Sequence, residues 1–273
     1  MRKFWMAVAG AVVLAIAVAG IASAVNTYDV HLANSQSAGK GTTAKPSPAK
    51  LRFGYRVGDT EGLRPQVIGE YRIAAEGLQS FPDARPKCSF EQAADPNVTT
   101  PDDLSPACRR AIVGGGVIQN AVGAPNDRSQ QEACEVDLTL INISSGDPRF
   151  PSTMGQVRRR GGMAIRIDGT PPRCLTDVHD ALAAPFYDVK IQGVSTAELR
   201  FKVPSTLTHP SGLDNSVREV TSTVQKKTGR VRIKGKRRTV GFYSSVGRKG
   251  RTRTVRVTFI DESGVKKTAT AQD

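Results

Sequence analysis

The chain has 273 residues, of which 38% are hydrophobic, 23% charged and only 5% aromatic, and its formal net charge is +14. This is the composition of a globular protein, because the apolar residues are too few and too dispersed for a membrane protein with many spans, and no heptad repeat predicts a coiled coil. A partner attracted over long range should be anionic, since the net charge is strongly positive.

Residues 1–24 predict a secretory signal peptide. Arg2 and Lys3 precede an uncharged run over residues 4–21, and Ala22-Ser23-Ala24 matches a cleavage site of small residues. We therefore expect export and cleavage after Ala24. The run is also long enough to cross a bilayer, so an uncleaved single-pass anchor is the alternative. In either case we expect the protein to be secreted or associated with the cell envelope.

Residues 25–50 are expected to form a flexible linker. The segment 33–50 consists mainly of Ala, Ser, Gly, Thr, Pro and Lys and shows no apolar period. Such a segment cannot bury enough surface to offset the entropy lost on ordering. A single folded domain is expected over residues 51–273, because all-β domains of this length are common.

The folded region consists of short segments in which apolar and polar residues alternate, as in strands with one buried face. The first covers residues 51–57, where Arg52, Gly54 and Arg56 separate apolar positions. Ten more strands are expected near residues 67–75, 112–122, 134–144, 163–168, 187–192, 199–203, 217–225, 230–234, 239–244 and 253–260. Turn signals rich in Gly and Pro separate them. The pattern predicts a mainly β protein, an antiparallel β-sandwich.

One short helix is expected over residues 100–111. Thr100 is a suitable N-cap, Pro101 suits the first helical position, and Asp102 and Asp103 favour the positive end of the helix dipole. The glycines at 114–116 follow it, but they lack the strand, G-x-G-x-x-G, helix order of a dinucleotide site. We therefore expect no nucleotide cofactor, and we interpret these glycines as flexible backbone or as close packing within a sheet.

Cys88, Cys108, Cys134 and Cys174 form an even set in a chain expected to be exported, which favours two disulfides over free thiols. None belongs to a C-x-x-C pair, and no histidine lies at metal-ligand spacing, so we expect no structural metal site. Three connectivities are possible. Sequential pairing closes the shortest loops.

Two segments carry a resemblance to other proteins. The first begins at Cys88 and continues through Cys108-Arg109-Arg110-Ala111 to Ile112-Val113-Gly114-Gly115-Gly116, and the second is Thr254-Val255-Arg256-Val257-Thr258-Phe259. Over about residues 51–260, the chain resembles uncharacterised secreted β-sandwich proteins of actinobacteria. The resemblance implies an exported β-sandwich whose helix is held by the first two cysteines. It implies no catalytic residue, because that group has no assigned activity.

The strongest charge feature is a basic C-terminal stretch. Residues 226–257 contain thirteen Lys or Arg and no Asp or Glu, so most of the net charge is concentrated there. In a strand, Val231 and Ile233 would face the core while Arg230 and Arg232 project from the other face about 7 Å apart. The candidate anion-binding residues are Arg230, Arg232, Lys234, Lys236, Arg237, Arg238, Arg248, Lys249 and Arg251.

In an exported protein, such a surface points to anionic wall polymers or a phospholipid surface. DNA is another anionic polymer, but only Phe242 and Tyr243 lie nearby to stack on bases. The alternative interpretation is passive, because Lys and Arg also protect exposed strand edges from aggregation or are simply solvated.

Evidence for catalysis is sparse. Asp177-Val178-His179-Asp180 is the best titratable cluster, and His179 has the chemistry of a general base, yet we interpret this segment as a surface turn. No G-x-S-x-G motif is present, and the S-x-x-K matches that begin at Ser37 and Ser47 fall in the expected linker. We therefore predict a non-catalytic binding or structural protein of the cell envelope without a cofactor. The alternative is a secreted hydrolase that uses scattered Asp and Glu residues with His179.

Overall fold

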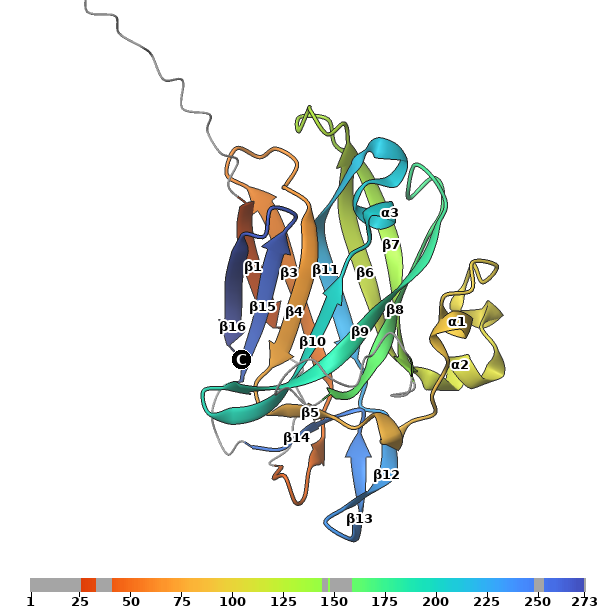
Figure 1. Ribbon diagram of the computed structural model, residues 1–273, viewed down its shortest axis with the longest axis vertical. Helices are drawn as coiled ribbons and strands as arrows, with labels where there is room; N and C mark the ends of the chain where they lie inside the picture. Colours follow the sequence, from red (N-terminus) through yellow and green to blue (C-terminus); the bar gives the residue numbers. More distant parts are fainter. Residues whose placement is uncertain (1–25, 33–40, 144–146, 148–158, 248–252, 273) are drawn as a thin grey trace, which may run out of the picture.

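The computed structural model describes residues 26–32, 41–143, 147, 159–247 and 253–272 (Figure 1). The expected signal peptide and three of the candidate anion-binding residues, Arg248, Lys249 and Arg251, lie outside the described residues. Within the described ranges, no helix is long and apolar enough to cross a membrane.

Eleven strands form one antiparallel sheet, in the spatial order β1-β3-β11-β6-β7-β8-β9-β10-β4-β15-β16. They are β1 (Asn26–Leu32), β3 (Leu51–Asp59), β4 (Ile68–Ala75), β6 (Ile112–Gly123), β7 (Glu132–Ile143), β8 (Arg159–Gly169), β9 (Val178–Ile191), β10 (Val194–Lys202), β11 (Asp214–Val224), β15 (Thr254–Asp261) and β16 (Lys266–Gln272). The sheet curls until its edge strands β1 and β16 lie alongside each other (Figure 1), which produces a nearly closed barrel or sandwich.

Two smaller sheets lie at one end of the curled sheet. One has the order β2-β14-β5, formed by β2 (Ser47–Pro48), β14 (Tyr243–Ser245) and β5 (Leu78–Ser80). The other is a hairpin of β12 (Thr228–Ile233) and β13 (Lys236–Gly241), which projects from this end (Figure 1). The prediction of a mainly antiparallel β protein is confirmed.

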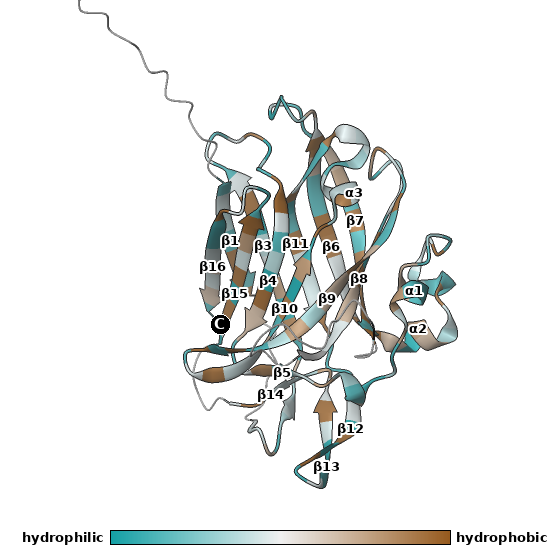
Figure 2. Ribbon diagram, in the orientation of Figure 1, coloured by the Kyte–Doolittle hydropathy of each residue, from teal (hydrophilic) through white to brown (hydrophobic). Residues whose placement is uncertain are grey.

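The main core lies inside the curled sheet. In β3, Phe53, Tyr55 and Val57 are buried while Arg52 and Arg56 are exposed, as the alternation predicts. Hydrophobic and hydrophilic residues are interspersed along many of the other strands (Figure 2). Facing strands meet through aromatic contacts, and the ring of Tyr55 lies 5.6 Å from that of Tyr71 and 5.3 Å from that of Phe259. Such edge and tilted contacts stabilise cores beyond area burial alone.

The prediction of a flexible linker over residues 25–50 is wrong for the part of it that the structure describes. Residues 26–32 form β1, which pairs with β3 along its whole length, and Val30 is buried. Residues 41–50 include β2, and Ala49 is fully buried. The physical reason is tertiary: Tyr28, Val30 and Leu32 have the period of two of a strand, and pairing supplies the free energy that local composition lacks.

The expected helix over residues 100–111 is divided. A 3-10 turn, η2 (Pro101–Asp103), is capped by Thr100, and α2 (Pro106–Ala111) begins after Ser105, whose side chain accepts a hydrogen bond from the Cys108 amide. The break occurs because a proline disfavours the helical conformation in the residue before it. The other helical segments are single turns: η1 (Pro82–Ala84), α1 (Phe90–Ala93), α3 (Ser205–Thr208) and η3 (Pro210–Gly212).

The four cysteines form two disulfides with sequential pairing, Cys88–Cys108 and Cys134–Cys174. The first closes the helical lobe of α1, η2 and α2, which lies on the outer side of β7 and β8 (Figure 1). Two disulfides indicate an oxidising compartment. Of the two interpretations of the glycines at 114–116, the structure supports close packing, because a Cβ on Gly114 or Gly116 would overlap carbonyl oxygens of β11.

Candidate functional site

The candidate anion-binding surface is built on the β12–β13 hairpin. A two-residue turn joins the strands, with φ values of 48° at Lys234 and 76° at Gly235. Positive φ at both positions is the geometry of a type I′ turn, whose twist matches that of paired strands. Arg230 and Arg232 are exposed, while Val231 and Ile233 are half-buried, so the predicted alternation is observed.

The register of the hairpin brings like charges together. Arg232 lies directly opposite Arg237, and Arg230 is on the same face one pleat away. The Cβ atoms of such a pair are about 5 Å apart, and like charges in this position are destabilising. None of the three arginines has an ion-pair partner within the described part of the chain. A bound anion would therefore reduce the repulsion between Arg232 and Arg237.

A basic groove lies where the hairpin meets β2. Lys45, Arg237 and Arg238 line it together with Ser47 and Thr239, and no acidic residue is among its lining. The Nε atom of Arg238 is buried and has no hydrogen-bond partner among the described residues. Lys45 was not identified from the sequence, because it falls in the expected linker and reaches the groove only through the pairing of β2 with β14.

A second groove lies between the hairpin and the body of the protein, and Arg232 is the one basic residue among its lining. Of the residues that line this groove, only Asp83 is acidic, and its carboxylate accepts a 2.6 Å hydrogen bond from Nζ of Lys87.

Six of the nine candidate anion-binding residues lie on the β12–β13 hairpin: Arg230, Arg232, Lys234, Lys236, Arg237 and Arg238.

The structure corrects the position of His179, which lies in β9 rather than in a surface turn. Cross-strand pairing places it opposite Asp168 of β8, and its Nδ1 lies 2.9 Å from Oδ1 of Asp168. The same carboxylate accepts hydrogen bonds of 2.9 and 2.8 Å from Nε and Nη2 of Arg166, which is completely buried. The local sequence alone gave no sign of this pairing.

Arg166 connects the sheet to the helical lobe. Its guanidinium donates to the carbonyl oxygens of Ala93, at the end of α1, and of Asp95, at 2.9 and 3.1 Å, and also to that of Val98. Carbonyls after the last helical turn have no partner within the helix, so a buried cation is well suited to bind them. The chain of contacts from His179 through Asp168 to Arg166 thus holds the lobe in place.

This geometry bears on the hydrolase alternative. Asp168 already binds Arg166, and among the described residues the ring of His179 has no hydrogen bond to a serine, threonine or cysteine. The described ranges also contain no group of three or more His, Cys, Asp or Glu residues suited to a metal ion. The use of His179 in catalysis stays a prediction.

A second histidine forms ion pairs that the sequence did not reveal. His209 follows α3, and its Nδ1 lies 3.0 Å from Asp214 while its Nε2 lies 2.8 Å from Glu262. Partial burial disfavours the charged form of the ring and by itself would lower the pKa of His209. The hydrogen bond and charge of Glu262, together with the smaller effects of Asp214, outweigh burial, so the pKa of His209 is raised above 6.5. Glu262 lies far along the sequence, so only the fold brings it near.

We expect the His209→Gln variant to be less stable than the wild type, by a margin that shrinks as pH rises from 6 to 9. Because the folded-state pKa is raised, the contribution of His209 is complete below about pH 6.5 and is lost above the folded-state pKa. Thermal unfolding of both proteins at several pH values measures the margin. A Glu262→Gln variant should show the same weakening of pH dependence; a margin that is constant or grows with pH contradicts the assignment.

Comparisons with protein-family models, with curated proteins and with solved structures gave no match for this chain. The resemblance to secreted actinobacterial proteins therefore stays a prediction.

Proposed function

We propose that this protein is an exported, non-catalytic binding protein of the cell envelope, which contacts phosphate-rich anionic polymers or lipids through the β12–β13 hairpin. The observation that carries the proposal is the convergence of Lys45, Arg237 and Arg238 in one groove that no acidic residue lines. Lys45 comes from a separate segment, so the fold concentrates positive charge beyond what the basic stretch does by itself.

Two features favour a binding role over passive solvation. The opposed pair of Arg232 and Arg237 is unfavourable without an anion. The pair does not stabilise the eleven-stranded sheet either, because the hairpin is a separate two-stranded sheet. Of the six Arg and Lys residues on the hairpin, five have exposed side chains. Exposed Arg and Lys side chains can bind phosphate oxygens through charge-assisted hydrogen bonds.

The position of the hairpin also suits contact with an extended surface. It projects from the end of the curled sheet opposite α3, so its tip reaches a flat surface before the body of the protein does (Figure 1). An array of phosphates binds such a cluster partly through the release of counterions, so that affinity falls steeply with salt concentration. The two disulfides are consistent with a location outside the reducing cytosol.

The test is binding of the protein to two probes over a salt series: inorganic polyphosphate, and vesicles of phosphatidylglycerol and phosphatidylcholine, with pure phosphatidylcholine vesicles as the neutral reference. A Lys45→Gln, Arg232→Gln, Arg237→Gln variant should bind on the order of 100-fold more weakly at low salt, because each cation near an anionic surface contributes about 1 kcal/mol. The dependence of log affinity on log salt should also become shallower, by about 2 to 3.

A Lys190→Gln, Lys266→Gln, Lys267→Gln variant is the matched control. It removes the same charge from exposed positions in β9 and β16, and we expect it to bind nearly as tightly as the wild type. Stronger binding to polyphosphate would identify a polymer as the partner, and stronger binding to vesicles a membrane surface. If both variants lose the same amount of affinity, binding depends on the net charge alone, and this result would contradict the proposed site.

A further inference from the structure

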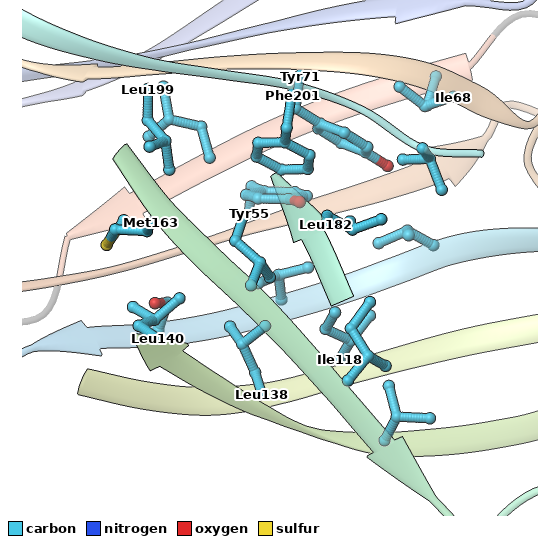
Figure 3. Close-up of a pocket in the computed structure, with 18 of the residues that line it drawn as sticks. Tyr55, Ile68, Tyr71, Ile118, Leu138, Leu140, Met163, Leu182, Leu199 and Phe201 are labelled. Atoms are coloured by element: carbon cyan, nitrogen blue, oxygen red, sulfur yellow. The ribbon is translucent and has the colours of Figure 1, made fainter. Parts of the chain in front are cut away.

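The interior of the curled sheet holds an apolar cavity of about 100 Å³. Its lining comes from both walls of the sheet, and Leu207 and Thr208 of α3 line the end where the chain crosses from β10 to β11. Figure 3 shows Tyr55 between Phe201 on one side and Leu138 on the other. Apolar cavities of comparable size in proteins stay free of water and take up small apolar molecules.

The lining of the cavity selects against charged ligands. None of the residues that line it is charged. Burial raises the pKa of both Tyr55 and Tyr71, so the two hydroxyl groups are neutral. An ionised molecule would lose its hydration on entering and gain no opposite charge in return. A molecule that occupies this space is therefore neutral.

Two polar atoms in the lining have no hydrogen bond within the described part of the chain: Oδ1 of Asn120 and Oδ1 of Asn215. The hydroxyl of Tyr71 is paired with that of Tyr55. Asn120 is 8% exposed. The amide Nδ2 of Asn215 donates to the Leu207 carbonyl at 2.8 Å, so its Oδ1 is left as an acceptor. Buried polar atoms without partners are rare and unfavourable, and each requires an explanation.

The strand register groups the two amides. Asn120 of β6 lies directly opposite Val217 of β11, and Asn215 is two residues before Val217, so all three lie on the inner face. Both amides are therefore near the end of the cavity that α3 covers. The rest of the lining is dominated by aliphatic and aromatic side chains.

We propose that this cavity binds a small neutral amphiphile, an alkyl chain or ring that carries one hydroxyl group. The apolar body packs against side chains such as Leu138, Leu182 and Leu199, and the hydroxyl donates to Oδ1 of Asn120. No residue of the β12–β13 hairpin lines this cavity, and the site does not depend on the function proposed for the hairpin.

The experiment uses three probes of similar size: 1-hexanol, toluene and hexanoate at pH 8. Met163 lines the cavity, so the carbon-13 signal of its methyl group reports entry, and a Met163→Leu variant assigns that signal. We expect saturable shifts of the signal and a higher Tm with 1-hexanol and with toluene. Hexanoate should bind at least 100-fold more weakly than 1-hexanol.

Two variants locate the site. Asn120→Leu keeps the branched shape and the number of non-hydrogen atoms but has no acceptor, so it should weaken 1-hexanol binding about 3- to 10-fold, the range of one hydrogen bond, and leave toluene binding less affected. Leu138→Phe fills the cavity and should abolish binding of both. Circular dichroism and unfolding check that each variant is folded, and Leu182→Phe provides a second filling variant from another strand. The Lys266→Gln, Lys267→Gln variant is the control.

Three results overturn the proposal. The Met163 signal and the Tm do not change with 1-hexanol or toluene, which shows that the cavity is closed to ligands. Hexanoate binds as tightly as 1-hexanol, which shows that the site does not select neutral molecules. Folded variants with a filled cavity bind 1-hexanol normally, which places the site elsewhere.

Discussion

Replacing Arg166 by leucine is expected to lower the free energy of unfolding by about 3 to 5 kcal/mol, the range for breaking a buried ion pair. The change leaves the Asp168 carboxylate buried without its cation. It also removes the donors that bind the carbonyl oxygens of Ala93, Asp95 and Val98. Urea unfolding of the variant and the wild type measures the difference.

Arg173→Leu is the matched control for this prediction. Arg173 also binds two carboxylates, with 2.7 Å contacts to Glu135 and to Asp137, but its side chain is 40% exposed. Exposed ion pairs contribute about 0 to 1 kcal/mol, so the control should be nearly neutral. A double variant, Arg166→Leu with Asp168→Leu, should recover part of the loss because it removes the unpaired charge. Equal effects of Arg166→Leu and Arg173→Leu would contradict the role of burial.

The second large effect concerns the disulfide between Cys134 and Cys174. The Cys134→Ser, Cys174→Ser variant should lose about 4 kcal/mol of unfolding free energy by the chain-entropy relation for a loop of this length. The bridge links positions 40 residues apart, and both cysteines are buried. It ties β7 to the turn after β8, so the unfolded chain gains considerable freedom when it is removed. Denaturant unfolding under non-reducing conditions gives the value.

The other disulfide supplies the comparison. Cys88 and Cys108 are 20 residues apart, and the same relation gives about 3 kcal/mol for their loop. Removing this pair should also increase proteolysis within the helical lobe, whereas removing Cys134 and Cys174 should not. If removing the Cys134–Cys174 disulfide lowers the free energy of unfolding by less than about 1 kcal/mol, this disulfide does not stabilise the protein by constraining the unfolded chain.

The sequence predicts most of the central strands well, because alternation is strong wherever one face is buried, but it finds only the end of β9, whose first residues it interprets as a turn. It misses the edges. β16 consists of polar and small residues such as Lys266 and Lys267, most of them exposed, and carries little apolar period. β1 is short and is followed by a polar segment that hides its alternation. Edge strands depend on pairing with a neighbour more than on their own side chains, so their existence is a tertiary property.

The candidate site shows a similar division. The exposed row of Arg230 and Arg232 follows from a period of two, and the structure places it where the pattern predicts. Lys45 and the contact of His209 with Glu262 arise from segments far apart in the chain, and no local pattern indicates them. The interior cavity is also invisible to sequence reasoning, because it depends on how side chains from many strands fail to fill the space between them.

The order of strands in the sheet has a consequence for how the chain folds. β3 and β4 come early in the sequence, yet apart from the pairing of β1 with β3 their neighbours all come late, since β3 pairs with β11 and β4 with β10 and β15. Until β10, β11 and β15 have been synthesised, these early strands have unpaired backbone groups along one edge or both. Pairings this distant make closure slow. The first strands to be synthesised thus acquire most of their partners only after the greater part of the chain has been made.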